Sequence, residues 1–157
     1  MVQAHGLADV LARVLAGRGV TADGATRHLA PRLRDLMPDP STLREMDAAV
    51  ARLADAIERS EHVAIFGDYD VDGACSAVAL AQFLERFGAK ARIHIPDRIF
   101  EGYGPNSEAI GMLHGEGASL LVCVDCGTSS HEPLAEARRL GMDVVVLDHH
   151  QAPEKLP

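Results

Sequence analysis

The chain has 157 residues, enough for one domain with a substantial buried core, and 47% of them are hydrophobic. No run of about eighteen or more apolar residues could span a bilayer, which excludes a helical membrane protein. The formal net charge of −8 argues at first sight against a nucleic-acid-binding protein, since binding to phosphates usually requires a basic surface. This objection weakens if several carboxylates are metal ligands.

The N-terminal segment and the cysteines indicate the cellular compartment. Charged and polar residues interrupt the apolar residues of positions 1–19, so this segment lacks the continuous core of a secretory signal. Cys123 and Cys126 form a lone CxxC pair and Cys75 stands apart, so no second pair completes a zinc site. We therefore expect reduced cysteines and a cytoplasmic protein.

The N-terminal part of the chain predicts a helical segment, a linker and a longer helix. Residues 4–30 are typical of one or two amphipathic helices. Their apolar face comprises Leu7, Val10, Leu11, Val14 and Leu15. Three prolines in residues 31–42 predict a linker, because proline cannot continue a helix. Thr42 and Glu45 form a capping box, which predicts a helix from there to about Ser60.

From residue 62 the sequence alternates between short apolar runs and helical stretches. Four apolar runs predict strands: HVAIFG, KARIHIP, SLLVCVD and MDVVVLD. Strands this apolar suit a parallel sheet covered by helices on both faces. The predicted fold is a doubly wound, Rossmann-like α/β domain over residues 41–157, preceded by an N-terminal helical segment and linker over residues 1–40. Because no helix follows the fourth strand, we expect a truncated domain.

Ligands of open α/β sheets bind beyond the carboxyl ends of the strands, where this sequence concentrates metal-ligand residue types. After the first strand, Asp68, Asp70 and Asp72 occupy alternate positions, so an extended segment would direct all three carboxylates to one side. Converging carboxylates in a partly desolvated crevice repel one another unless a cation neutralises them. The motif therefore predicts a divalent-metal site.

The third and fourth strands place further ligand types at the same edge. Asp125 follows the third strand, before a glycine and small hydroxyl residues that allow close backbone approach, and is a candidate bridging ligand. Asp148, His149 and His150 follow the fourth strand, and imidazole with carboxylate suits Mn²⁺ and similar ions. The three strand ends together predict a divalent-metal phosphoesterase centre.

Each of these motifs also has a simpler interpretation. The DxDxD spacing resembles the start of a calcium-binding EF-hand loop, but no glutamate follows at the last ligand position. Asp125 could be a helix N-cap or turn residue, and His149 with His150 could be ordinary surface or core histidines. Asp148 could orient a neighbouring imidazole without touching a metal. The metal interpretation is favoured because three separate strand ends agree.

The second strand ends differently, in the segment IPDRIFEGYGP. Arg98 supplies a planar cation, Tyr103 an aromatic ring and Gly102 a flexible backbone position, which suit gripping a phosphate and stacking a base. Alternatively, Arg98 pairs with Asp97 or Glu101 on the surface while Tyr103 packs on the sheet. Beside a metal centre, we favour a role in substrate positioning.

Four motifs, GDYDVDG, IPDRIFEGYG, VDCG and LDHH, occur in this order at the predicted strand ends. They closely resemble the DHH phosphoesterase superfamily and, within it, the RecJ single-strand exonucleases. The resemblance covers about residues 38–151. It implies a manganese- or magnesium-dependent enzyme that degrades single-stranded DNA from its 5′ end in recombination and repair, with single-strand-binding protein and a recombination helicase as further partners.

The resemblance also implies individual roles, carried over by motif position. Four side chains would be metal ligands: Asp70, Asp72, Asp125 and His149. Asp68 and His150 would be catalytic residues that contact water, phosphate or the ligands, and Asp148 would be an orienting residue. Arg98 and Tyr103, with Gly102 between them in the same loop, would contact the substrate. Such enzymes continue with a further metal-binding aspartate, a second domain and an OB-like module, none of which lies within these residues.

The expected chemistry is two-metal hydrolysis with ions roughly 4 Å apart, in which Asp125 would bridge the two ions. Two other functions stay open. One is an oligonucleotide or cyclic-dinucleotide phosphodiesterase of the same superfamily. The other is a non-catalytic nucleic-acid-binding scaffold, although the expected carboxylates are all present. A folded but inactive fragment is a further alternative.

Overall fold

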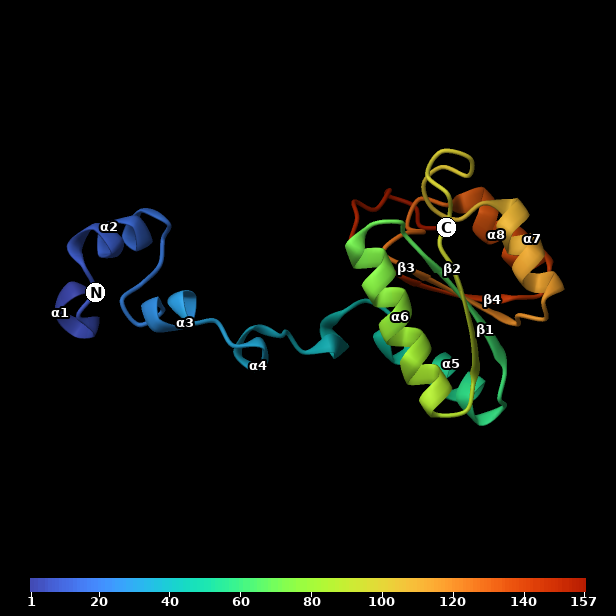
Figure 1. Ribbon diagram of the computed structural model, residues 1–157, viewed down its shortest axis with the longest axis horizontal. Coiled ribbons are helices and arrows are strands. Elements are labelled where there is room, and N and C mark those ends of the chain that lie inside the picture. Colours follow the sequence, from blue (N-terminus) through green and yellow to red (C-terminus); the bar gives the residue numbers. More distant parts are fainter. The chain divides into compact units, whose positions relative to one another are not determined.

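The computed structural model describes residues 1–157 and divides into two compact units, Met1–Met46 and Asp47–Pro157. The first unit is mostly short helices, and the second holds the sheet (Figure 1). The sequence analysis placed the division between residues 40 and 41, six residues earlier than this one. None of the helices combines the length and the apolar character needed to cross a membrane.

The first unit contains short helical elements. They are α1 (Val2–His5), α2 (Asp9–Gly17), α3 (Ala25–Leu29), α4 (Leu33–Leu36) and the 3₁₀ turn η1 (Pro40–Thr42). One or two helices were predicted over residues 4–30, and α2 and α3 lie within this range. The short α1 before them ends at Gly6, which adopts a positive φ angle. Leu15 is buried as predicted, whereas Val10 and Val14 are exposed. The predicted linker contains α4.

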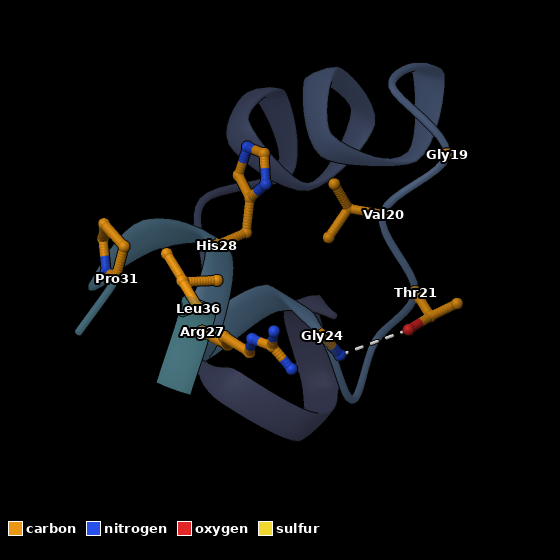
Figure 2. Close-up of a pocket in the computed structure, with 8 residues that line it drawn as sticks. All are labelled: Gly19, Val20, Thr21, Gly24, Arg27, His28, Pro31 and Leu36. Carbon is orange, nitrogen blue, oxygen red and sulfur yellow. Dashed lines mark hydrogen bonds between the residues drawn. The ribbon is translucent and has the colours of Figure 1, made fainter. Parts of the chain in front are cut away.

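A hollow of about 390 Å³ opens on the surface of the first unit (Figure 2). Its lining includes two glycines and both polar and apolar side chains, with Arg27 and His28 as its ionisable side chains. Thr21 Oγ1 accepts a hydrogen bond from the Gly24 N–H at 3.2 Å and so holds one side of the hollow. The lining contains no carboxylate and therefore no set of ligands for a hard divalent cation.

Helix α5 spans Met46–Glu58 and begins later than the predicted capping box. The Thr42 hydroxyl does not cap it, because it donates to the Asp39 carbonyl at 2.7 Å within η1. Glu45 has a φ of 57°, which is incompatible with a helical position. Thr42 therefore belongs to the short 3₁₀ turn that starts at Pro40, and the helix begins four residues after it.

The second unit contains the four predicted strands in one parallel sheet, with a predicted helix between each consecutive pair. The strands are β1 (His62–Gly67), β2 (Lys90–His94), β3 (Leu120–Val124) and β4 (Asp143–Leu147), in the spatial order β2-β1-β3-β4. The helices are α6 (Val71–Arg86), α7 (Ser107–Gly115) and α8 (His131–Arg139). Gly67 pairs with Val124, which in turn pairs with Leu147, so the carboxyl ends of three strands meet at one edge.

Helices cover both faces of the sheet, as predicted (Figure 1). Along β1, Val63 and Ile65 pack into one core with α5 and α6, whereas Ala64 and Phe66 pack into another core with α7 and α8. All four side chains are fully buried. This alternation, with both faces apolar, is what a parallel sheet buried on two sides requires.

A polar network closes the amino edge of the sheet. Arg52 on α5 donates to Glu61 at 2.6 Å and to Asp143 at 2.7 Å, and the Ser119 hydroxyl also donates to Glu61 at 2.7 Å. Glu61 immediately precedes β1, Ser119 precedes β3 and Asp143 begins β4. The network therefore fastens α5 to the starts of three strands, at the edge opposite the predicted metal centre.

Candidate metal centre

The predicted centre lies where the strand order reverses. The chain passes from β1 to β2 on one side and then places β3 on the other side of β1. In doubly wound sheets this switch point opens a crevice beyond the carboxyl ends of the two strands. Asp68 follows β1 and Asp125 follows β3, so the two residues flank the switch point. They are the buried charged residues of the chain, 4% and 5% exposed.

The acidic motif after β1 is not extended, which corrects the sequence expectation. Asp70 is the N-cap of α6 and accepts hydrogen bonds from the N–H groups of Asp72 and Gly73 at 2.9 and 3.1 Å. Asp72 already lies in the first helical turn. The carboxylates therefore approach one another through a strand-to-helix turn rather than through the two-residue period of a strand.

Gly73 makes this turn possible, and the sequence analysis did not single it out. A Cβ at position 73 would lie 2.5 Å from the backbone nitrogen of Asp68 and 2.6 Å from its carbonyl oxygen. Only glycine allows the first turn of α6 to lie this close to the end of β1. The signal was present as the glycine that ends DYDVDG, but spacing alone does not reveal which backbone it faces.

Asp125 lies at the middle of the site and is held by its backbone. Its N–H donates to the Leu147 carbonyl at 2.8 Å, and its φ of 61° is unusual for a residue with a side chain. Its buried Oδ1 has no hydrogen-bond partner, although His149 Nε2 lies 3.0 Å away. A buried carboxylate oxygen without a partner is costly unless a cation or another ligand completes it.

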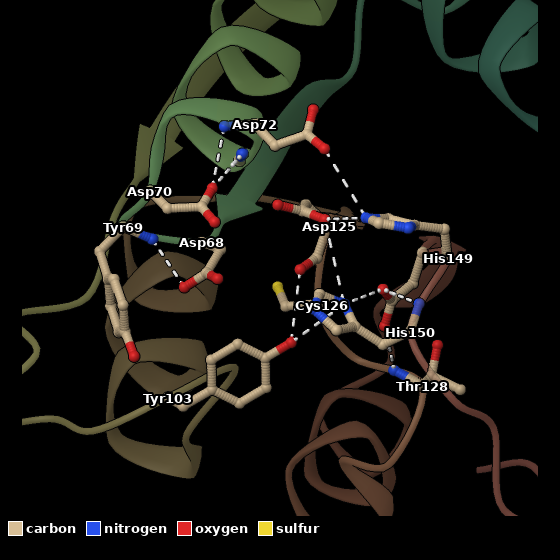
Figure 3. A network of polar contacts seen from close by, with 12 residues as sticks. Asp68, Tyr69, Asp70, Asp72, Tyr103, Asp125, Cys126, Thr128, His149 and His150 are labelled. Carbon is tan, nitrogen blue, oxygen red and sulfur yellow. Dashed lines mark hydrogen bonds and ion pairs between the residues drawn. The ribbon is translucent and has the colours of Figure 1, made fainter. Parts of the chain in front are cut away.

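Two groups of potential ligand atoms share Asp125 (Figure 3). One comprises Asp68, Asp70 and Asp125, and the other comprises Asp125, His149 and His150; within each group the atoms lie within 4.8 Å of one another. Asp72 belongs to neither group, but its Oδ2 lies 3.6 Å from His149 Nε2. The structure therefore brings the predicted ligands Asp70, Asp72, Asp125 and His149 to one site, together with Asp68 and His150.

The electrostatics of the site favour a cation. Burial raises the pKa of Asp125, and the negative charges of Asp72 and Asp70 raise it further, while His149 and His150 act in the opposite direction. A divalent ion would remove this conflict by neutralising the carboxylates together. The buried oxygen without a partner and the mixed carboxylate and imidazole donors fit Mn²⁺ or Mg²⁺.

Asp148 contacts an imidazole rather than the acidic group. Its carboxylate accepts hydrogen bonds from the N–H groups of Thr128 and His150, at 3.0 and 3.1 Å, and lies 2.8 Å from His150 Nδ1. Burial tends to raise the pKa of Asp148, but the hydrogen bonds from Thr128 and His150 outweigh it and hold the pKa well below its usual range. Its ionised carboxylate thus fixes the His150 ring.

The loop after β2 reaches the site through Tyr103. The Tyr103 hydroxyl donates to the Asp125 carbonyl at 3.4 Å and lies 3.3 Å from His150 Nδ1. The Arg98 guanidinium lies 5.2 Å from the centroid of the Tyr69 ring. Neither of the surface ion pairs considered for Arg98 forms. Gly102 has a φ of 84°, which a residue with a side chain rarely adopts.

This chain is therefore an α/β protein with a candidate divalent-metal site at the switch point of its parallel sheet. Carboxylates and imidazoles at the strand ends form that site. Residues 62–157 match the model of the DHH family, N-terminal domain, and the chain belongs to this family. This confirms the fold class, which was predicted from the apolar strands, and the resemblance, which was predicted from the four motifs.

Curated relatives of this chain include single-stranded-DNA-specific exonucleases. The single-stranded-DNA-specific exonuclease RecJ of Bacillus subtilis (strain 168) is 36% identical over 96% of this chain and 19% of the relative. That of Escherichia coli (strain K12) is 33% identical over 96% of this chain and 26% of the relative. The chain therefore spans about a fifth to a quarter of the length of these relatives.

Two solved structures share the fold. A crystal structure of exonuclease RecJ bound to manganese superimposes with a TM-score of 0.69 and 34% identity, covering 78% of this chain and 30% of that one. RecJ from Thermus thermophilus in complex with Mn²⁺ superimposes with a TM-score of 0.66 and 29% identity, covering 78% of this chain and 17% of that one.

Proposed function

We propose that this chain carries the metal-binding part of a nuclease that hydrolyses phosphodiester bonds in single-stranded DNA from the 5′ end, in recombination and repair. The observation that supports it most directly is Asp125, a buried carboxylate with an unpartnered oxygen, shared by two groups of potential ligands. Mn²⁺ or Mg²⁺ held there would polarise the phosphate and lower the pKa of a bound water.

Within this proposal the ligands divide around Asp125. Asp70 and Asp72 come from the start of α6 on one side, and His149 comes from the segment after β4 on the other. Asp125 would bridge two ions. Asp68 and His150 lie in the same groups of atoms as the ligands, close enough to contact a bound water or the phosphate. Asp148 would keep the His150 ring in place.

The loop after β2 would position the substrate. Burial, followed by the negative charges of Asp148 and Asp68, raises the pKa of Tyr103 to about 12. The Tyr103 hydroxyl therefore stays protonated at neutral pH and can donate a hydrogen bond. Arg98 offers a guanidinium to a phosphate, and Gly102 provides the backbone turn between them. Cytoplasmic residence stays a prediction from the N-terminal segment and the cysteines. Binding to single-strand-binding protein and to a recombination helicase stays a prediction from the resemblance.

The net charge of −8 is compatible with this proposal. Five of the carboxylates, those of Asp68, Asp70, Asp72, Asp125 and Asp148, lie at or beside the candidate centre. Divalent ions would neutralise several of these charges before a phosphate approaches. The surface that a DNA strand meets is then much less negative than the sequence implies.

Calorimetric titration of the full chain with Mn²⁺ tests the centre independently of turnover. Asp125→Asn keeps the shape of the side chain but removes the shared charge, so Mn²⁺ affinity should fall at least about tenfold with little loss of stability. The control Asp55→Asn changes an exposed carboxylate on α5 and should bind Mn²⁺ like the wild type. Equal affinity in Asp125→Asn would refute the metal assignment.

Turnover tests the substrate. Single-stranded DNA is labelled at its 5′ end in one sample and at its 3′ end in another. With Mn²⁺, the wild type should release the 5′ label first and should act poorly on a duplex. Release of label only from the 3′ end would refute the proposed polarity. Preference for a dinucleotide or cyclic dinucleotide would indicate the phosphodiesterase alternative.

A further inference from the structure

The loop between β2 and α7 presents two large apolar side chains to solvent beside the candidate centre. Ile99 and Phe100 are 84% and 87% exposed, the highest values among the large hydrophobic side chains of the chain. Single exposed apolar residues are ordinary. Here two such residues follow one another at the tip of a loop that contacts the site through Tyr103. This arrangement indicates a ligand-binding surface.

The backbone of this tip is held rigidly. Asp97 Oδ1 accepts hydrogen bonds from the N–H groups of Ile99 and Phe100 at 2.8 and 3.1 Å. The Asp97 carbonyl accepts from the N–H of Glu101 at 2.8 Å, and the Glu101 carboxylate accepts from the Asp97 N–H at 2.9 Å. His94 Nε2, at the end of β2, lies 3.0 Å from the same carboxylate. The tip therefore needs little ordering when a ligand binds.

Planar side chains lead from the metal centre to this loop. The rings of His150 and Tyr103 have centroids 5.9 Å apart, and those of Tyr103 and Tyr69 are 6.3 Å apart (Figure 3). Arg98 lies over Tyr69, and Phe100 follows Arg98 by two positions. Phe100 therefore belongs to the same loop as Arg98 and Tyr103, which connect this row of rings to the candidate centre.

We propose that Phe100, with Ile99 beside it, is a stacking subsite for an unpaired nucleobase, next to Arg98, which would contact the backbone phosphate. This inference rests on the proposed function and deepens it. A base has an accessible face only when its strand is unpaired, so such a subsite would favour single strands over duplex. Two side chains are too small a surface for a stable protein partner, whose interface covers roughly 800 Å² on each side.

The test compares two short strands with the same phosphates: fluorescent oligo(dT), and an abasic strand of equal length. Binding of each strand to the full chain is measured by fluorescence anisotropy, with Ca²⁺ in the buffer. Phe100→Ala should weaken binding of oligo(dT) about tenfold and leave binding of the abasic strand unchanged, because only the stacked base is lost. Phe100→Trp should retain wild-type affinity for oligo(dT) within about threefold, since it keeps an aromatic face.

Phe87→Ala is the matched control. It removes an exposed phenylalanine, 55% accessible, at the opposite end of α6 from the candidate centre, and should bind both strands like the wild type. If the wild type binds and hydrolyses oligo(dT) but Phe100→Ala binds it equally well, the stacking subsite is wrong and the proposed function stands. If the wild type neither binds nor hydrolyses oligo(dT), both are wrong.

Discussion

Replacing Gly73 by alanine should damage the metal centre without altering any ligand. The new Cβ would lie 2.5 Å from the Asp68 nitrogen, whereas ordinary contacts begin at 3.4 Å, so the two backbones must separate by about 0.9 Å. Such overpacking lowers the free energy of unfolding by about 1–3 kcal/mol. The higher helix propensity of alanine offsets only about 1 kcal/mol of this loss. The clash is with backbone, which cannot rotate away, so we expect a net loss of about 1–2 kcal/mol.

The separation also moves Asp68 relative to Asp70, which caps the same helical turn. Displacing groups that orient metal ligands costs roughly 10–100-fold in affinity, so Gly73→Ala should bind Mn²⁺ at least about tenfold more weakly. Urea denaturation followed by circular dichroism gives the stability, and calorimetry gives the affinity. The control Gly111→Ala lies within α7, where a Cβ would meet nothing within 4 Å, and should gain up to about 1 kcal/mol. Wild-type stability and affinity in Gly73→Ala would refute this reasoning.

Two further predictions concern stability. The Arg52 hydrogen bond lowers the pKa of Glu61 despite partial burial, so its stabilisation is fully present above the ordinary pKa of 4.5 and is lost as pH falls through the lowered value. Glu61→Gln should therefore lower the free energy of unfolding by about 2 kcal/mol in urea denaturation at pH 7. If the variant were destabilised by the same amount in acid, the ionised Glu61 carboxylate would not be the source of the difference. Phe66→Ala, in the fully buried core, should cost about 3–5 kcal/mol, whereas Phe83→Ala, half exposed on α6, should cost much less; similar losses would disprove the assigned core.

The sheet and the location of the site were predictable because they follow from local pattern. Runs such as Val63–Phe66 are apolar on every position, which only a sheet buried on both faces explains. Once the strands are parallel, their carboxyl ends share an edge, and Asp125 must lie near the residues after β1 and β4. That step also needs the spatial order of the strands, because Asp125 lies beside the ends of both β1 and β4 only when β3 lies between them.

The local geometry of the site was less predictable because it depends on tertiary contacts. The alternation of Asp68, Asp70 and Asp72 matches the period of a strand, but α6 begins at Val71 and uses Asp70 as its cap. The positive φ of Asp125 carries no sequence signature, since glycine is the usual residue there. Tyr69 contacts both Arg98 and Tyr103 but was not predicted as a site residue. It lies within the acidic motif, in which only the carboxylates were interpreted.

The network around Arg52 has a consequence for how the protein handles its metal. It fastens α5 to the amino ends of three strands, and the buried apolar residues of β1 and β3 separate it from the carboxylates at the other edge. In small zinc domains the ion itself supplies the free energy of folding, so removing it unfolds the chain. Here the two edges are anchored independently, so we expect the framework to persist when a divalent ion at the candidate centre is removed or exchanged.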